Sequence, residues 1–117
     1  KEPLGPLVRQ GDQEWEDVVR WTHFIMINAE EAGITMYNVD DMLDSKNKEV
    51  LRILGEEGYI GPMLGLGMKF GYNIIEQVGN YGESFERNVG EETPLALERG
   101  LNKLWKDGGI LYVPPIR

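Results

Sequence analysis

The chain has 117 residues, of which 41% are hydrophobic, which is enough for one domain with a modest core. Its 20 acidic and 12 basic residues give a formal charge of −8, which argues against binding to nucleic acid or to anionic membranes. Because there is no cysteine, disulfides, thiolate chemistry and cysteine-based zinc sites are excluded.

The first eleven residues predict an extended segment. Pro3 and Pro6 restrict the residues before them to extended conformations, and Leu7 and Val8 follow directly. We expect a short extended segment or edge strand over residues 1–11, which ends in a turn near Gly11.

Residues 12–33 carry the clearest helix signal. Asp12 can cap this helix, acidic residues occupy its first turns, and Gly33 is a natural stop. Its apolar residues recur at helical spacing and cover so much of the circumference that the helix should be largely buried. These residues are Trp15, Val18, Val19, Thr22, Ile25, Met26 and Ala29, with Trp21, Phe24 and Ile27 beside them.

Two short helices and a loop are expected next. Asn38 and Asn47 are the predicted caps, and Gly55 ends the second of these helices. The glycine-rich stretch 55–71 predicts a compact loop with room for one helical turn.

The helical pattern returns over residues 69–90, with one continuous apolar face. Gly79 and Gly82 interrupt it, and the close approach of another backbone would explain both. A last helix is predicted from Thr93 and Pro94 to residue 107, followed by an extended tail over 110–117. The predicted fold is mainly α, with short extended or β segments at the ends, in a single domain over residues 1–117.

Residues suited to catalysis or metal binding have simpler interpretations. His23 is the only histidine and lies among aromatic residues, which favours a partly buried structural role. The acidic cluster Asp40, Asp41 and Asp44 does not fit a calcium loop, because Met42 takes a ligand position. It is interpreted as acids at a helix start.

The other candidates give no enzyme signature. The glycine-rich loop lacks the lysine and hydroxyl residues of a phosphate loop. The pairs Glu30–Glu31 and Glu91–Glu92 are predicted to be solvated, and three tryptophans are predicted to belong to the core: Trp15, Trp21 and Trp105. We therefore predict no enzyme activity, no cofactor and no metal.

Three stretches cover most of the chain, in this order: KEPLGPLVRQGDQEWEDVVRWTHFIMINAEEAGIT, QVGNYGESFERNVG and PLALERGLNKLWKDGGILYVPPIR. Together they resemble the general L-amino-acid-binding proteins of bacterial ABC importers. The resemblance implies part of one lobe of a two-lobe α/β periplasmic-binding-protein fold, with a helical C-terminal extension. It implies a lobe helix over 12–33, an extension over 34–117 and a hinge-like strand within 1–11 that includes Lys1, Glu2, Pro3, Leu4 and Gly5.

The resemblance also implies a role and partners. The chain would be the C-terminal part of a periplasmic substrate-binding component, and the parent protein would bind an L-amino acid and a membrane permease. In that family an arginine and an acidic residue hold the ligand, and neither matches a residue here, including Arg9, Arg20 and Arg52. We therefore expect the chain alone not to bind ligand. The alternative is a free-standing helical interaction module that self-associates, and a homo-oligomer is expected for the isolated chain.

Overall fold

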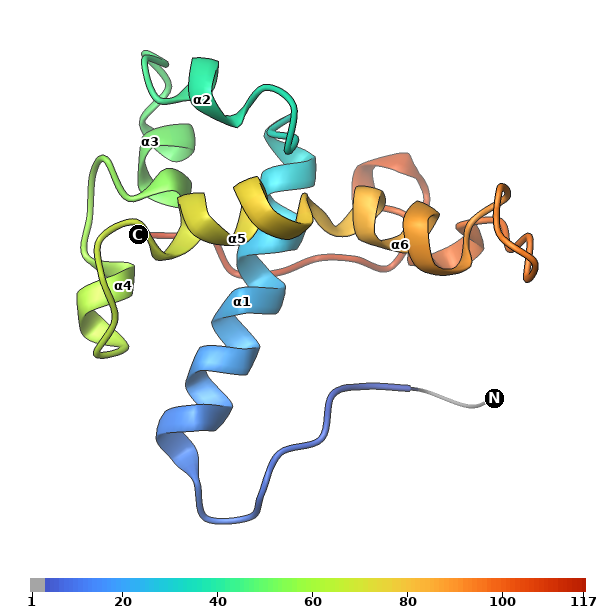
Figure 1. Ribbon diagram of the computed structural model, residues 1–117, viewed down its shortest axis with the longest axis horizontal. Helices are drawn as coiled ribbons and strands as arrows, with labels where there is room; N and C mark the ends of the chain where they lie inside the picture. The colour runs from blue at the N-terminus through green and yellow to red at the C-terminus, as the bar shows by residue number, and fades with distance from the viewer. Residues whose placement is uncertain (1–3) are drawn as a thin grey trace.

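One long helix, α1 (Gln13–Glu31), organises the fold in the computed structural model, which describes residues 4–117. At 1.5 Å per residue, α1 is about 28 Å long. Its first half projects from the molecule, and the other elements gather around its second half (Figure 1). Within residues 4–117 there is no β-sheet, only an isolated parallel bridge between Leu104 and Leu111.

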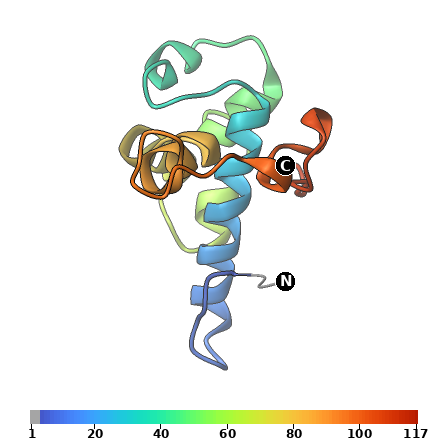
Figure 2. The same cartoon turned by 90° about the vertical axis from the view of Figure 1, so that its right-hand side faces the viewer.

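The remaining helices are short, and two of them cross α1. Figure 1 shows α5 and α6 running one after the other across its upper part, and Figure 2 shows α6 and the C-terminal residues on opposite sides of it. The mainly α prediction is confirmed. None of the helices within the described residues is long and apolar enough to cross a membrane. The helices after α1 are α2 (Val39–Met42), α3 (Lys48–Leu54), α4 (Ile60–Met63), α5 (Phe70–Val78) and α6 (Tyr81–Val89).

Local capping signals set the bounds of α1 and α3. The Asp12 carboxylate accepts a hydrogen bond from the Trp15 backbone N–H at 3.2 Å, and the Asn47 side chain caps α3 in the same manner. Gly33 and Gly55 follow these helices with φ of 72° and 84°, a left-handed conformation that glycine adopts without steric cost. The predicted helices that begin after Asp12 and Asn47 are therefore confirmed.

The predicted continuous helix over residues 69–90 is wrong, because the chain breaks between α5 and α6. Gly79 has a φ of 78°, which ends α5. The Asn80 side chain then accepts from the Glu83 backbone N–H at 2.9 Å, and the Glu83 carboxylate accepts from the Asn80 N–H at 2.8 Å. This reciprocal capping box starts a new helix at Tyr81.

The predicted last helix over residues 93–107 is also wrong. The Thr93 hydroxyl donates to the Gly90 carbonyl at 2.8 Å, so it does not serve as a helix cap. Ala96 has a φ of 46°, which interrupts any right-handed helix at that point. The segment holds only two short 3₁₀ turns, Gly100–Asn102 and Trp105–Asp107, and the predicted helical extension is irregular beyond α6.

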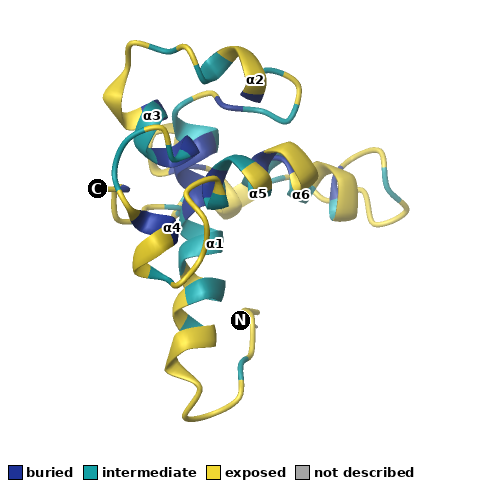
Figure 3. Ribbon diagram, turned by 60° about the vertical axis from the view of Figure 1, so that its left-hand side comes forward, coloured by how far each residue is buried: buried dark blue, intermediate teal, exposed yellow. Residues whose placement is uncertain are grey.

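The hydrophobic core lies where α3, α5 and the tail meet the second half of α1. Figure 3 shows the buried residues gathered there and the first half of α1 mostly exposed or half-buried. The tail over residues 110–117 is extended, as predicted. Its residue Ile116 belongs to this core, with 2% of its surface exposed. The core residues are Ile25, Ala29, Ile34, Val39, Val50, Ile53, Leu54, Ile60, Ile75 and Ile116.

Gly71 allows α3 and α5 to pack closely. A Cβ atom at this position would lie 1.8 Å from the carbonyl oxygen of Ile53 and 3.6 Å from a methyl of Ile25. Only glycine leaves room for this approach of two backbones. The expected close backbone contact therefore exists in this region, but at Gly71.

Candidate interaction surface

The first half of α1 carries an apolar face that no other element fully covers. The sequence predicted a largely buried helix, and this is wrong for the first half, because buried positions in α1 begin at Ile25. Trp15, predicted to be a core residue, is 53% exposed. We call this surface the α1 face, and its residues are Trp15, Val18, Val19, Thr22, His23 and Met26.

The extended N-terminal segment runs beside the α1 face and leaves two pockets along it. One, of about 310 Å³, lies between Pro6 and the α1 face. The other, of about 270 Å³, is lined by Pro6, Val8, Glu16, Val19, Arg20 and His23.

The predicted hinge-like strand is only partly described. Leu4 and Gly5 are exposed and carry no strand pairing, and Leu4 is 94% exposed. Lys1, Glu2 and Pro3 lie outside the described residues. The hinge role therefore stays a prediction.

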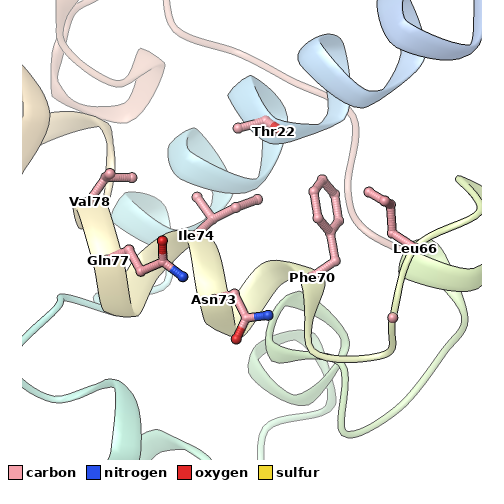
Figure 4. A pocket seen from close by; sticks show the side chains of 8 residues that line it. Thr22, Leu66, Phe70, Asn73, Ile74, Gln77 and Val78 are labelled. Carbon is pink, nitrogen blue, oxygen red and sulfur yellow. The ribbon is translucent and has the colours of Figure 1, made fainter.

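A groove of about 360 Å³ continues this surface between α1 and α5. Figure 4 shows Thr22 on α1 facing Ile74 and Phe70 on α5. Thr22 lines both the α1 face and this groove, so the two adjoin at this residue. The residues lining the groove are uncharged: Thr22, Leu66, Gly67, Phe70, Asn73, Ile74, Gln77 and Val78.

His23 is half-buried on the α1 face, as predicted for a structural histidine. Its ring meets the Tyr81 ring edge-on, with 5.8 Å between the ring centroids. Burial lowers the pKa of His23 below its ordinary value of 6.5, because the charged imidazolium is poorly solvated there. The neutral ring is therefore the favoured form near neutral pH.

An ion pair joins the end of α1 to the C-terminal segment. The Arg99 guanidinium donates hydrogen bonds to both carboxylate oxygens of Glu30, at 2.9 and 3.1 Å. It also lies over the rings of Tyr81 and Phe85, with its central carbon 5.4 and 5.5 Å from their centroids. The Arg99 and Glu30 side chains are only 15% and 18% exposed, so the prediction of a solvated Glu30 is wrong.

Gly82 makes room for this ion pair. A Cβ atom there would lie 2.8 Å from Arg99 Nη1 and 3.1 Å from the Glu30 carboxyl carbon. Side chains, not another backbone, therefore explain this helical glycine. The role of Arg99 was not predicted from the sequence. The glycine at position 82, inside a helical pattern, was the local indication that another group packs closely against α6.

The tail is held against α1 by polar contacts as well as by its buried end. The Asn28 carboxamide donates to the Pro114 carbonyl at 2.8 Å. The Trp105 indole donates to the Glu31 carboxylate at 3.1 Å, and Trp105 itself is 50% exposed, contrary to the predicted core position. These contacts keep residues 99–117 on α1 without the help of any sheet.

Two further candidates from the sequence, Asp40 and Arg20, are engaged by neighbouring side chains. Asp40 is at the start of α2, as predicted, and accepts a hydrogen bond from the Tyr72 hydroxyl at 2.6 Å, which raises the pKa of Tyr72. Arg20 pairs with Glu16 on α1. Over residues 4–117 no three histidine or acidic side chains are grouped to hold a metal.

Comparisons with known proteins identify relatives of this chain in sequence. No protein-family model matches it. It is 56% identical over its whole length to the general L-amino acid-binding periplasmic protein AapJ of Rhizobium johnstonii and to the putative amino-acid ABC transporter-binding protein YhdW of Escherichia coli. It is 48% identical to the glutamate/glutamine/aspartate/asparagine-binding protein BztA of Rhodobacter capsulatus. The chain spans 35% of the length of each of these relatives.

A solved structure agrees with these relatives. The periplasmic binding protein of an ABC transporter from Brucella ovis, determined with glutathione bound, matches 94% of this chain and 35% of its own chain. The TM-score is 0.89 and the sequence identity is 53%. The chain therefore corresponds, over all of its own length, to a C-terminal segment of the periplasmic amino-acid-binding proteins of ABC transporters.

Proposed function

We propose that the chain supplies part of one lobe of the periplasmic substrate-binding component of an amino-acid ABC importer. The observation that carries this proposal is 56% identity over the whole chain to binding proteins of such transporters. Its relatives are named as binding proteins, which supports a binding role over a catalytic one. The partners of the complete protein would then be an L-amino acid and a membrane permease.

We propose that the chain divides into three parts. Residues 1–11 would be a hinge-like strand, α1 the lobe helix, and residues 34–117 the C-terminal extension. The α1 face would pack against the remainder of the lobe, because an apolar helix face is stable only when another element covers it.

We propose further that the chain does not hold an amino acid by itself. A free amino acid needs a cation for its carboxylate and an acceptor for its ammonium group, both aimed into one pocket. The groove of Figure 4 is lined by uncharged residues, and Arg99 is already paired with Glu30. In the pocket beside Pro6 and Val8, the two charged residues Arg20 and Glu16 are paired with each other. This arrangement supports a scaffold role in which the rest of the protein supplies the clamp.

The second candidate is a free-standing module that self-associates through the α1 face. It is favoured by the exposed apolar side chains Leu4 and Leu7 of the N-terminal segment, which are 94% and 97% exposed. Sedimentation velocity over a wide range of protein concentration tests it. A monomer at every concentration excludes this module, whereas a dimer that dissociates on dilution supports it.

A chimera tests the main proposal. The matching segment of the Rhizobium johnstonii protein is replaced by this chain, and L-amino acids are titrated calorimetrically. We expect dissociation constants within about tenfold of those of the unmodified protein, because the segment is similar throughout. A chimera that folds, as judged by its circular dichroism spectrum, yet binds no L-amino acid that the unmodified protein binds would contradict the proposal.

A further inference from the structure

The loop over residues 100–112 is closed by its own backbone hydrogen bonds. The Leu111 N–H donates to the Lys103 carbonyl at 3.1 Å, and the Trp105 N–H donates to the Leu111 carbonyl at 3.0 Å. Gly109 takes part in this closure, because a Cβ atom there would lie 1.8 Å from the Lys103 carbonyl oxygen. A loop closed in this way holds its side chains in defined positions.

The same loop is fixed to the last residue of α1 (Figure 2). The Trp105 indole donates to the Glu31 carboxylate at 3.1 Å, and the Lys106 ammonium donates to the Glu31 carbonyl at 3.0 Å. The α1 face extends only from Trp15 to Met26. The loop is therefore anchored beyond the end of the α1 face and is a separate surface.

Four apolar side chains of this ordered loop are exposed, and we call them the C-terminal patch. The Trp105 and Tyr112 rings meet edge-on, with 5.7 Å between their centroids. Large aromatic side chains that are already ordered lose little conformational entropy on binding, and they are typical of the centre of a protein interface. The residues of the patch are Leu101, Trp105, Ile110 and Tyr112, which are 66%, 50%, 67% and 76% exposed.

The C-terminal patch belongs to a basic segment of an acidic chain. Residues 99–117 contain four basic side chains and one acidic side chain, a net charge of +3. Residues 1–98 contain eight basic and 19 acidic side chains, a net charge of −11. Lys103 and Lys106 are both exposed within the loop. This charge favours an acidic partner surface, and it opposes a dimer in which two patches face each other.

The membrane permease of an importer meets this requirement. In membrane proteins the excess of lysine and arginine lies in the cytoplasmic loops, so loops on the periplasmic side have few basic residues to neutralise their acidic ones. An anionic lipid surface fits less well, because it would repel the charge of −11 on residues 1–98.

We propose that the C-terminal patch, with Lys103 and Lys106, docks on an acidic periplasmic loop of the membrane permease. The apolar side chains supply the centre of the contact, and the two lysines steer the approach and set its orientation. The proposal rests on the proposed function and adds the surface through which the permease is bound.

Binding of a chimera to the permease tests this proposal. The Rhizobium johnstonii protein that carries this chain in place of its matching segment is titrated onto the permease of the same bacterium in nanodiscs of zwitterionic lipid. Tyr112→Asp puts a charge on the patch, and Tyr37→Asp, at a side chain that is 89% exposed before α2, is the matched control. We expect Tyr112→Asp to weaken binding about tenfold or more and Tyr37→Asp to change it by less than about twofold. Equal affinity of the two variants would overturn the proposal.

A second pair of variants tests the charge. Lys103→Glu reverses a charge in the loop, and Lys46→Glu reverses an exposed charge before α3. We expect Lys103→Glu to slow association with the permease, most strongly at low salt, and Lys46→Glu to leave the rate unchanged. Equal association rates would show that the basic segment does not face the permease.

Titration of each chimera with L-amino acids separates this proposal from the proposed function. Variants that bind L-amino acids normally but bind the permease weakly support docking through the patch. If Tyr112→Asp also abolishes amino-acid binding or unfolds the chimera, the patch is an internal contact and the docking proposal is wrong. Equal binding of the unsubstituted chimera to anionic nanodiscs without permease would likewise overturn it. A folded, unsubstituted chimera that binds no L-amino acid would instead contradict the proposed function.

Discussion

Arg99 and Glu30 form a bidentate ion pair between α1 and the C-terminal segment. The pair is about 85% shielded from water, bidentate, and enclosed by two aromatic rings. In such surroundings each charged hydrogen bond is stronger than at the surface. Removing one partner leaves the other charge partly buried without compensation, which destabilises the fold.

Arg99→Met should therefore destabilise the chain. We expect the free energy of unfolding to fall by about 2 kcal/mol, because Glu30 loses two charged hydrogen bonds while remaining partly buried. Urea unfolding measures the change, and Arg9→Met, at an exposed position, is the control. Adding Glu30→Gln to Arg99→Met should cost much less than Glu30→Gln alone. Additive effects of the two changes would refute a direct pair.

His23 should make stability depend on pH. Its pKa is lowered by burial in the folded chain, so the unfolded chain takes up the proton first as pH falls. The stability provided by the neutral ring is complete well above pH 6.5, and decreases as pH falls from about 6.5 towards the folded pKa.

The variant His23→Gln isolates this effect. Urea unfolding at about pH 8 and about pH 5.5 brackets the ordinary histidine pKa of about 6.5. We expect the loss of stability between these two values to be smaller in the variant than in the parent chain. Glu16 and Arg20, which line the same pocket, are present in both and do not affect the comparison. An identical loss in both proteins would mean that His23 is as solvated as in the unfolded chain.

At the scale of elements, the close packing of α3 on α5 depends on the lack of a side chain at Gly71. Gly71→Ala would place a methyl group 1.8 Å from the Ile53 carbonyl oxygen, so the two helices must move apart. We expect a loss of about 1–3 kcal/mol, the usual cost of overpacking a core. Gly67→Ala is the matched control, because a Cβ atom there meets nothing within 4 Å. Thermal unfolding of both variants gives the comparison, and equal melting temperatures would argue against the close contact.

The elements also show which parts of a sequence can be interpreted locally. The starts of α1 and α3 were predictable because a cap is set by residues within one helical turn. The break at Gly79 was missed because the apolar spacing continues across it, although Asn80 and Glu83 carry a capping-box pattern. The last helix was predicted from a strong local pattern, and contacts with Gly90 and Glu30 override it.

The interaction surface was predictable only in part. The sequence marked the residues from Trp15 to Ala29 as an apolar stripe, and the stripe exists. It could not show that the half from Ile25 onward is covered within this chain and the other half is not. That division depends on contacts of α1 with α3, α5 and Pro114, which lie in later parts of the chain.

For the whole molecule, the fold divides into a buried core around the second half of α1 and a less covered α1 face. We propose that this face packs against the remainder of the lobe in a longer binding protein. In that proposal, the residues that hold the amino acid lie in the remainder of the protein.

Calorimetric titration of the purified 117-residue chain with a panel of L-amino acids is the most direct test of this account. We predict no heat beyond dilution for any of them, while the chimera with the Rhizobium johnstonii protein binds them. Saturable heat at micromolar concentrations from the chain alone would contradict the account, and would place a complete amino-acid site within these residues.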